Sequence, residues 1–324
     1  MFKQLLQGAA AAALLLSASL SHAAETYPSR PVTLVVPFAP GGGVDQIGRY
    51  LAKRLEGRLG QPVIVENKPG AGASIGTARV AQAGPDGYTL LFTSIAHAIN
   101  PAFYPDLPFD TLKDFAPIAT VASSPNSIAA RADAPFNTLQ EMMAYARAHP
   151  DRLTYGAISG STTMYLGMAM FVAEARLPVR YIPYNGTPQS VQAAVAGEVD
   201  MVSSGYSSSE TFAKNGRLKM LAVSSAEPTP LAPGVPTIAE AAGLPGFEVK
   251  NWMGVLAPAR TPAAIVARLE GELKTILADA ESEKFFQSMK NDRFYSPPDA
   301  FRKLIAADIE RYRKIVQEIG AAQK

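Results

Sequence analysis

Short apolar runs alternate with longer amphipathic stretches along most of this chain, and this alternation does most to limit its possible folds. Residues 32–38 (Val-Thr-Leu-Val-Val-Pro-Phe) are typical of a buried strand. Apolar side chains then recur at spacings of three and four from Val44 to Leu59, as on one face of a helix. Strands that alternate with helices form parallel sheets with right-handed crossovers. The sequence therefore predicts an α/β fold.

Further strands and helices are expected from the same periodicities. We expect strands at residues 62–66, 88–93, 118–122, 153–155, 179–183, 199–202, 218–223 and 247–256. We expect helices near residues 74–83, 138–149, 163–171 and 187–197, and in the C-terminal third from 261 and from about 304. The proline-rich residues 228–245 predict a connecting loop. Two α/β units followed by helices fit a molecule of two lobes.

The first residues have the features of a cleaved signal peptide. Lys3 provides a positive charge, residues 8–20 are mostly alanine and leucine, and residues 21–23 end in the small residues that signal peptidase recognises. The apolar run is shorter than the roughly 20 residues that span a bilayer. The alternative is a buried N-terminal helix. Removal of residues 1–23 would leave 324 − 23 = 301 residues, which suggests two domains.

Composition excludes several classes of function. Cysteine is absent, which rules out disulfides, thiolate metal sites and cysteine nucleophiles. The net charge is +2 and no basic run stands out, so we do not expect nucleic-acid binding. After the leader no apolar run is long enough for a membrane helix. We therefore expect a secreted chain that is not embedded in a membrane.

Catalytic, metal and cofactor sites are not expected either. Outside the leader the only histidines are His97 and His149, too few for a zinc site. The serines of residues 159–161 do not match the G-x-S-x-G of a hydrolase nucleophile. The glycines of residues 69–76 have the spacing G-x-G-x-x-x-G, and no acidic residue follows at the distance that a dinucleotide site requires. We predict no catalytic residue, no metal ligand and no cofactor.

Three polar loops follow predicted strands, and we interpret them as a binding site for an anion. Their candidate residues are Pro40, Gly41 and Gly42, then Thr93 and Ser94, then Ser161, Thr162 and Thr163. Ligands of doubly wound sheets lie outside the carboxyl ends of strands, and backbone amides at a helix N-terminus attract negative charge. Alternatively, each loop alone contains only the residues that turns and helix N-caps favour.

Two ionisable residues lie next to these loops. Asp45 follows the glycines, where a carboxylate either offsets the helix dipole or contacts the ligand. His97 follows the strand at 88–93, so we expect it to lie in the cleft. We include both among the candidate ligand-binding residues.

Ordered sequence blocks across the whole mature chain carry a resemblance to one family. They include Val-Val-Pro-Phe-Ala-Pro-Gly-Gly at 35–42, Val-Glu-Asn-Lys-Pro-Gly-Ala-Gly at 65–72 and Pro-Asp-Gly-Tyr-Thr-Leu-Leu at 85–91. Further blocks lie at residues 27–31, 100–101, 114–118, 183–186, 197–200, 235–240 and 254–258. With these blocks the chain resembles the Bug-type receptors, the periplasmic substrate-binding components associated with tripartite tricarboxylate transporters.

The resemblance implies a two-lobe periplasmic-binding-protein fold, type II-like, with a hinge and a cleft between the lobes. Lobe 1 would comprise residues 24–123 and 251–324, and the inserted lobe 2 residues 124–250. In the family the loop that matches Phe38 to Gly43 commonly reaches a ligand carboxylate through bridging water. Thr93-Ser94 and Ser161–Thr163 lie in loops that match the family's other binding loops. Membrane permease subunits or a sensor kinase would be the partners.

The chain departs from the family pattern at three places. Many relatives have histidine where Tyr165 stands, Gly-Glu where Met168-Ala169 stand, and aspartate at the position of Ser204. A carboxylate at that last position would suit a ligand ammonium group, which Ser204 cannot neutralise. We therefore expect a ligand without an amine, with Ser204 among the residues around it.

The function expected from these residues is periplasmic capture of a small anionic organic solute for uptake or sensing. The solute would be a monocarboxylate, a dicarboxylate or an aromatic acid. One alternative is a secreted enzyme that acts on a small carboxylate ester or acid, which would need an acid–base pair in the cleft. The other alternative is a receptor that signals without transport.

Overall fold

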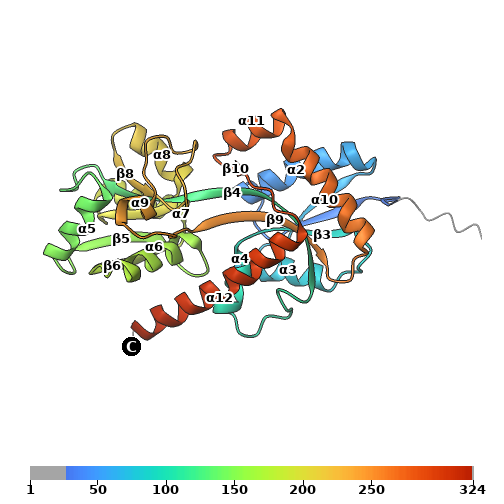
Figure 1. The fold of residues 1–324 in the computed structure, drawn as a ribbon, viewed down its shortest axis with the longest axis horizontal. Helices are drawn as coiled ribbons and strands as arrows, with labels where there is room; N and C mark the ends of the chain where they lie inside the picture. Colours follow the sequence, from blue (N-terminus) through green and yellow to red (C-terminus); the bar gives the residue numbers. More distant parts are fainter. Residues whose placement is uncertain (1–26, 323–324) are drawn as a thin grey trace, which may run out of the picture.

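The computed structural model describes residues 27–322, which form two halves joined by long strands (Figure 1). These strands are β4 (Phe115–Arg131) and β9 (Lys250–Pro258), and both run from one half into the other (Figure 1). The expected α/β fold with two lobes is therefore confirmed. The proposed signal peptide, residues 1–23, lies outside the described residues.

The first half is an α/β unit around strands in the order β2-β1-β3-β9-β4. Its parallel strands are β1 (Val32–Val36), β2 (Val63–Asn67) and β3 (Thr89–Ser94). The helices here are α2 (Gly43–Leu59), a short turn η1 (Ala71–Ala73), α3 (Ser74–Ala81), α4 (Ala96–Phe103), α10 (Ala263–Ala278), α11 (Ala280–Ser288) and α12 (Pro298–Ala322).

The second half continues the same sheet in the order β4-β7-β5-β6. Its parallel strands are β5 (Leu153–Ile158), β6 (Val179–Tyr184) and β7 (Met201–Gly205), while β8 (Leu218–Val223) pairs with β4. The helices of this half are α5 (Leu139–Ala148), α6 (Thr163–Glu174), α7 (Thr187–Ala196), α8 (Tyr206–Lys214) and α9 (Ile238–Ala242). A two-residue strand, β10 (Asp292–Arg293), also pairs with β4.

Strand β4 belongs to both halves because it changes partners along its length. Up to Pro125 it pairs with β9 in antiparallel register, and from Asn126 to Arg131 it pairs with β7 and β8. The parallel sheet expected from the sequence is therefore present in each half, and antiparallel pairs join the two.

Helix α12 is a second connection between the halves, since it packs against α4, β4 and α6. Its Asp308 accepts a hydrogen bond from the indole N–H of Trp252 on β9, at 2.8 Å, and both side chains are buried. Phe301 on the same helix packs edge-on against Trp252, with ring centroids 5.0 Å apart. One apolar core runs through both halves and includes α12.

Several elements differ from the expectations. Strand β4 is much longer than the expected 118–122, helices α4, α8 and α11 were not expected, and α9 interrupts the proline-rich stretch. Helix α9 begins with a capping box, in which Thr237 and Glu240 each bond the other's backbone N–H. Within residues 27–322 no helix is long and apolar enough to cross a membrane.

Candidate functional site

The loop after β1 is organised by the buried carboxylate of Asp45, which is 1% exposed. Its Oδ2 accepts hydrogen bonds from the Gly41 N–H at 2.8 Å and from Arg49 Nε at 2.9 Å. Its Oδ1 accepts one from Asn67 Nδ2 at 2.8 Å, and the same Nδ2 donates to the Phe38 carbonyl at 3.1 Å. Asp45 therefore holds the loop in shape, and its oxygens are occupied by the protein.

The charge of Asp45 is stabilised where it lies. Burial alone would raise the pKa of this carboxyl. The hydrogen bonds from Arg49, Gly41 and Asn67 favour the ionised form more strongly, so the pKa lies below its usual value. A carboxylate with a lowered pKa in the first turn of α2 also offsets the positive end of the helix dipole.

The N-terminus of α2 presents backbone amides without a side-chain cap in the described structure. Gly42 is the N-cap, and the first N–H groups of a helix have no partner within it. Residues 39–43 are exposed. Of the two amides expected to face an anion, that of Gly41 is already bonded to Asp45, and that of Gly42 has no hydrogen-bond partner among residues 27–322.

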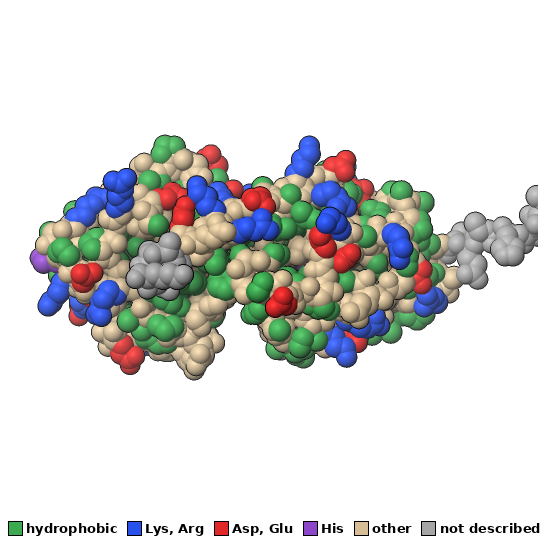
Figure 2. All heavy atoms as spheres, turned by 90° about the horizontal axis from the view of Figure 1, so that it is seen from below, with side chains coloured by type: hydrophobic (Ala, Val, Ile, Leu, Met, Phe, Trp, Pro, Cys, Tyr) green, Lys and Arg blue, Asp and Glu red, His purple; other side chains and the backbone are tan. Residues whose placement is uncertain are grey.

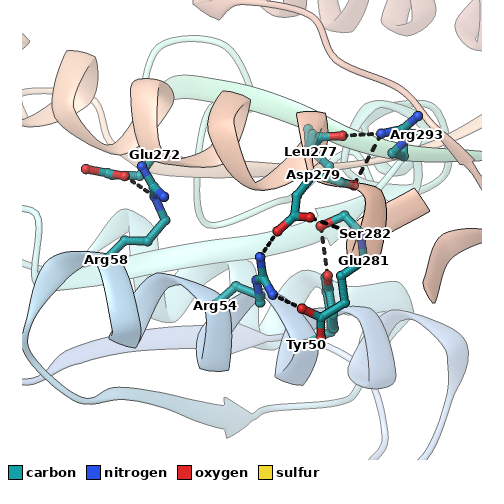
Figure 3. A network of polar contacts seen from close by, with 9 residues as sticks. All are labelled: Tyr50, Arg54, Arg58, Glu272, Leu277, Asp279, Glu281, Ser282 and Arg293. Atoms are coloured by element: carbon teal, nitrogen blue, oxygen red, sulfur yellow. Dashed lines mark hydrogen bonds and ion pairs between the residues drawn. The ribbon is translucent and has the colours of Figure 1, made fainter. Parts of the chain in front are cut away.

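A polar network fixes helix α2 against α10 and α11 (Figure 3). Arg54 of α2 pairs with both Asp279 and Glu281, and the Tyr50 hydroxyl lies 2.7 Å from that of Ser282. Two further pairs complete it, Arg58 with Glu272 and Arg293 with the carbonyl of Leu277. Each exposed ion pair contributes little to the free energy of folding. Together these pairs connect α2, the helix that follows residues 38–43 (the glycine loop), to helices more than 200 residues later in the chain.

Thr93 and Ser94 end strand β3 at the same edge of the sheet as the glycine loop, because β1 and β3 are parallel. Ser94 is 8% exposed, and its Oγ accepts a 3.3 Å hydrogen bond from the N–H of Ala96 at the start of α4. Thr93 is fully buried, and its hydroxyl has no hydrogen-bond partner among the described residues. Ser94 is thus the hydroxyl of this pair nearer the surface.

The structure places His97 in the core of the first half. The ring is 1% exposed, stacks parallel to Phe109 and meets Phe115 edge-on. Its Nε2 lies 3.2 Å from the Thr111 carbonyl. Burial lowers the pKa of His97 to about 4, so the ring is neutral at pH 7. The sequence put this residue near the cleft because it follows β3, but its helix turns the ring inward.

The loop after β5 supplies the N-terminus of α6. Thr162 is the N-cap, and its hydroxyl donates to the Ile158 carbonyl at 3.0 Å and accepts from the Tyr165 N–H at 3.3 Å. Thr163 is 4% exposed, and Ser161 is partly exposed. The Thr162 hydroxyl is therefore engaged in capping α6, and the Ser161 hydroxyl is the more accessible one to a ligand.

Ser161 lies against the first half at Gly72, a contact that the sequence did not reveal. A Cβ built on Gly72 would lie 3.2 Å from the Ser161 hydroxyl oxygen and 3.2 Å from Tyr104 of the first half. The turn at Gly72 follows β2, whose end lies at the same sheet edge as those of β1 and β3. The polar edges of the two halves therefore face each other. Figure 2 shows the molecule narrowing between its halves.

This turn has an unusual backbone. Gly70, Ala71, Gly72 and Ala73 follow one another with φ of 130°, 46°, 61° and 79°. Alanine rarely adopts positive φ, because its Cβ crowds the following carbonyl oxygen. Asn100 of α4 holds the turn, since its Nδ2 donates to the Gly72 carbonyl at 2.7 Å. No pattern of residue types signals this conformation at an alanine.

Asn126 on β4 is a second polar residue that sequence reasoning missed. It is 4% exposed, and neither its amide oxygen nor its amide nitrogen has a hydrogen-bond partner among the described residues. It lines a cavity of about 10 Å³ with Thr163 and Ser203. A space of this size holds about one water molecule.

Ser204 lies beneath the surface of the second half. It is 1% exposed, and its hydroxyl oxygen lies 2.7 Å from that of Ser209 in α8. The hydroxyl also donates to the Gly205 carbonyl at 3.2 Å. The side chain therefore stabilises the start of α8. Across residues 27–322 no group of histidines and carboxylates could hold a metal ion.

Comparisons with known proteins agree with this architecture. A profile of the tripartite tricarboxylate transporter family receptor, TctC, matches residues 47–321. The protein BugT of Bordetella pertussis is 31% identical over 303 residues, 93% of each chain. An R. palustris protein solved with adipate has a TM-score of 0.78 and 29% identity over 91% of this chain and 98% of its own. MatC of Rhodopseudomonas palustris, solved with malate, has a TM-score of 0.72 and 31% identity over 90% and 100%. The chain belongs to the tripartite tricarboxylate transporter receptor family.

Proposed function

We propose that this protein is a periplasmic receptor that closes its two halves around a small carboxylate. The observation that carries the proposal is the contact between Ser161 and Gly72, because it sets the polar strand ends of the halves against each other. Two structurally similar family members were solved with malate and with adipate. Both are small dicarboxylates.

The proposed ligand contacts are donors without a negative charge. The Gly42 amide and the Ser94 hydroxyl would come from the first half, and the Ser161 hydroxyl and the amides of the first turn of α6 from the second. Asp45 would act indirectly, because its oxygens hold the loop of residues 38–43. Buried donors of this kind bind a carboxylate strongly once closure excludes water.

Capture requires that the halves move. We propose that residues 24–123 and 251–324 form one lobe and residues 124–250 the other. β4 and β9 would bend where β4 changes partners, near Pro125. A ligand favours the closed form only through its higher affinity for that form. A permease subunit or a sensor would then recognise the closed shape.

Enzymatic turnover is the less favoured function. Hydrolysis or isomerisation would need an acid–base pair at the strand ends. His97, the one histidine of the first half, packs in the core with a pKa of about 4. The chain would therefore release its ligand unchanged.

Thermal-shift measurements on the mature chain would test the proposal. Malate, adipate and benzoate are the probes, with aspartate as the amine-bearing comparison. We expect at least one simple carboxylate to raise the melting temperature and aspartate to have a smaller effect. Tight binding of aspartate alone would contradict the expected ligand class, and the absence of any shift would contradict carboxylate capture.

A matched pair of variants assigns the binding to the glycine loop. Gly42→Leu places a side chain over the α2 N-terminus, whereas Gly57→Leu adds the same side chain on an exposed turn of α2 with no atom within 4 Å of the new Cβ. We expect Gly42→Leu alone to abolish the ligand-induced shift. An unchanged shift in Gly42→Leu would remove this loop from the site.

A further inference from the structure

A groove of about 1100 Å³ lies beside α6, and none of its lining residues belongs to the polar loops described above. One wall is α6, and the opposite wall is the C-terminal part of α12. Arg311, Lys314, Ile315 and Glu318 of α12 line it at spacings of three and four, which place them on one helix face. The groove thus lies between the second half and the helix that connects it to the first.

The floor of the groove is aromatic. Tyr181 of β6 lies between Tyr155 and Tyr165, with ring centroids 5.2 Å and 4.5 Å apart. Phe247 and Leu177 add buried apolar surface. Ligand pockets typically have volumes of about 300–1000 Å³ and combine apolar and aromatic walls with a few polar groups. The groove has the size and floor of a small-molecule site.

The rim of the groove carries more positive than negative charge. Four lining residues are cationic and two are acidic. The cationic residues are Arg147, Arg176, Arg311 and Lys314, and the acidic residues are Glu174 and Glu318. Arg147 and Arg311 each donate to one backbone carbonyl, those of Ala175 and Glu248, at 3.2 Å and 2.8 Å. A guanidinium has five N–H donors, so each retains others for a ligand.

Arg176 is held at this rim by the backbone. It is exposed in the turn between α6 and β6, with φ of 50°. This conformation is uncommon for residues other than glycine and asparagine. Figure 2 shows lysine and arginine side chains on the half that carries the groove, with acidic side chains among them.

We propose that this groove is a second binding site, which takes an amphiphilic organic anion: one carboxylate on an aromatic or alkyl body. The body would pack on Tyr165 and Tyr181, which are partly exposed, and the carboxylate would pair with Arg176, Arg311 or Lys314, whose Nζ also lies 3.8 Å from Glu318. Aromatic and cation–π contacts favour an aromatic body over an alkyl one. This site is separate from the proposed carboxylate cleft, and neither proposal depends on the other.

Calorimetric titration of the mature chain with 2-naphthoate tests the site, with decanoate as the alkyl probe. Ala173 is exposed on α6 and lines the groove, whereas Ala196 is exposed at the end of α7 outside it. Ala173→Trp would place a large side chain in the groove, and we expect 2-naphthoate affinity to fall at least tenfold. Ala196→Trp should leave the affinity unchanged. No binding to the wild-type chain, or equal binding to both variants, would overturn the proposal.

A second pair of variants tests the charge. Arg176→Glu combined with Lys314→Glu reverses two rim charges, and Arg217→Glu combined with Lys303→Glu makes the same change in net charge outside the groove. We expect only the rim pair to weaken 2-naphthoate, by about tenfold, and 2-naphthalenemethanol to bind weakly to both. Equal effects of the two pairs would overturn recognition of an anion.

The Gly42→Leu variant separates this site from the cleft. We expect 2-naphthoate to bind the groove in this variant as in the wild-type chain. If Gly42→Leu abolished 2-naphthoate binding while Ala173→Trp did not, the probe would occupy the cleft and the groove assignment would be wrong. If the charge variants impaired solute uptake although neither probe bound, the groove would be a protein-docking surface instead.

Discussion

Two buried ionisable side chains respond to pH in opposite directions. His97 packs between Phe109 and Phe115, and burial lowers its pKa to about 4 from 6.5. Burial raises the pKa of Asp308 to about 6 from 3.8, although the hydrogen bond from Trp252 opposes this shift. In each case the apolar surroundings favour the neutral form. The stability of the protein should therefore depend on pH through both residues.

Acid should destabilise the fold through His97. The unfolded chain takes up a proton near pH 6.5, but the folded ring does so only near pH 4. The contribution of neutral His97 to the free energy of unfolding is complete above pH 6.5. It is lost as pH falls through 4, which lowers that free energy by about 3 kcal/mol. We expect His97→Gln, which keeps an N–H donor for the Thr111 carbonyl, to remove this loss. Urea unfolding between pH 4 and 7.5 measures it, and parallel pH profiles for the two chains would contradict the expectation.

A rise in pH should destabilise the fold through Asp308. Because its folded pKa is the higher one, its contribution is complete below pH 3.8 and is lost as pH rises through 6, again by about 3 kcal/mol. Asn at this position still accepts from the Trp252 indole but carries no charge. We expect Asp308→Asn to gain stability over the wild-type chain as pH rises from 4 to 8. A constant difference across this range would show that Asp308 does not ionise as described.

Residue types at strand ends could be read from the sequence, but their burial could not. The glycines before α2 and the Ser-Thr loop before α6 lie where the sequence placed them. His97 and Ser204 are adjacent to such loops yet are buried by Phe109, Phe115 and Ser209, which are later in the chain. Local spacing carries no information about these tertiary neighbours.

Among the elements, the buried strands and most of the longer helices were predictable, whereas helices α4, α8 and α11 and the connections between the halves were not. Residues 123–127 (Ser-Ser-Pro-Asn-Ser) have the composition of a loop, yet they lie inside β4 because β9, β7 and β8 supply partners on both sides. Helix α11 has a polar sequence and is held by Arg54 and Tyr50 of α2. Tertiary contacts outweigh local preference in β4.

The turn at residues 70–73 offers a test at the scale of one element. Gly72→Ala would add a Cβ 3.2 Å from Ser161 in the other half, whereas Gly216→Ala adds one at a similar φ of 68° with no atom within 4 Å. Both should lose about 1–2 kcal/mol from the left-handed backbone. We expect only Gly72→Ala also to weaken ligand binding, because the new methyl group would hold the halves apart.

Calorimetric titration with the carboxylate found in the thermal-shift screen measures this difference. The comparison of the two variants removes the backbone cost that they share. Equal affinities would show that the contact between Gly72 and Ser161 does not control closure.

At the scale of the whole molecule, the continuous sheet and helix α12 should make the halves unfold together. β4 pairs with strands of both halves, and one apolar core extends from Leu91 in the first half to Phe171 in the second. Shared core residues make unfolding cooperative. We expect one calorimetric transition whose van't Hoff and calorimetric enthalpies agree, with far-ultraviolet circular dichroism changing at the same temperature. Two separate transitions would show that the halves are independent.

The sequence contains a single tryptophan, and the structure puts it in β9, sealed beneath α12. Trp252 is therefore a natural spectroscopic label at the place where the lobes would bend. Its intrinsic emission should report motion there without a dye or an engineered cysteine. The neighbouring carboxyl, which ionises near pH 6, should quench or shift that emission over a narrow interval of acidity.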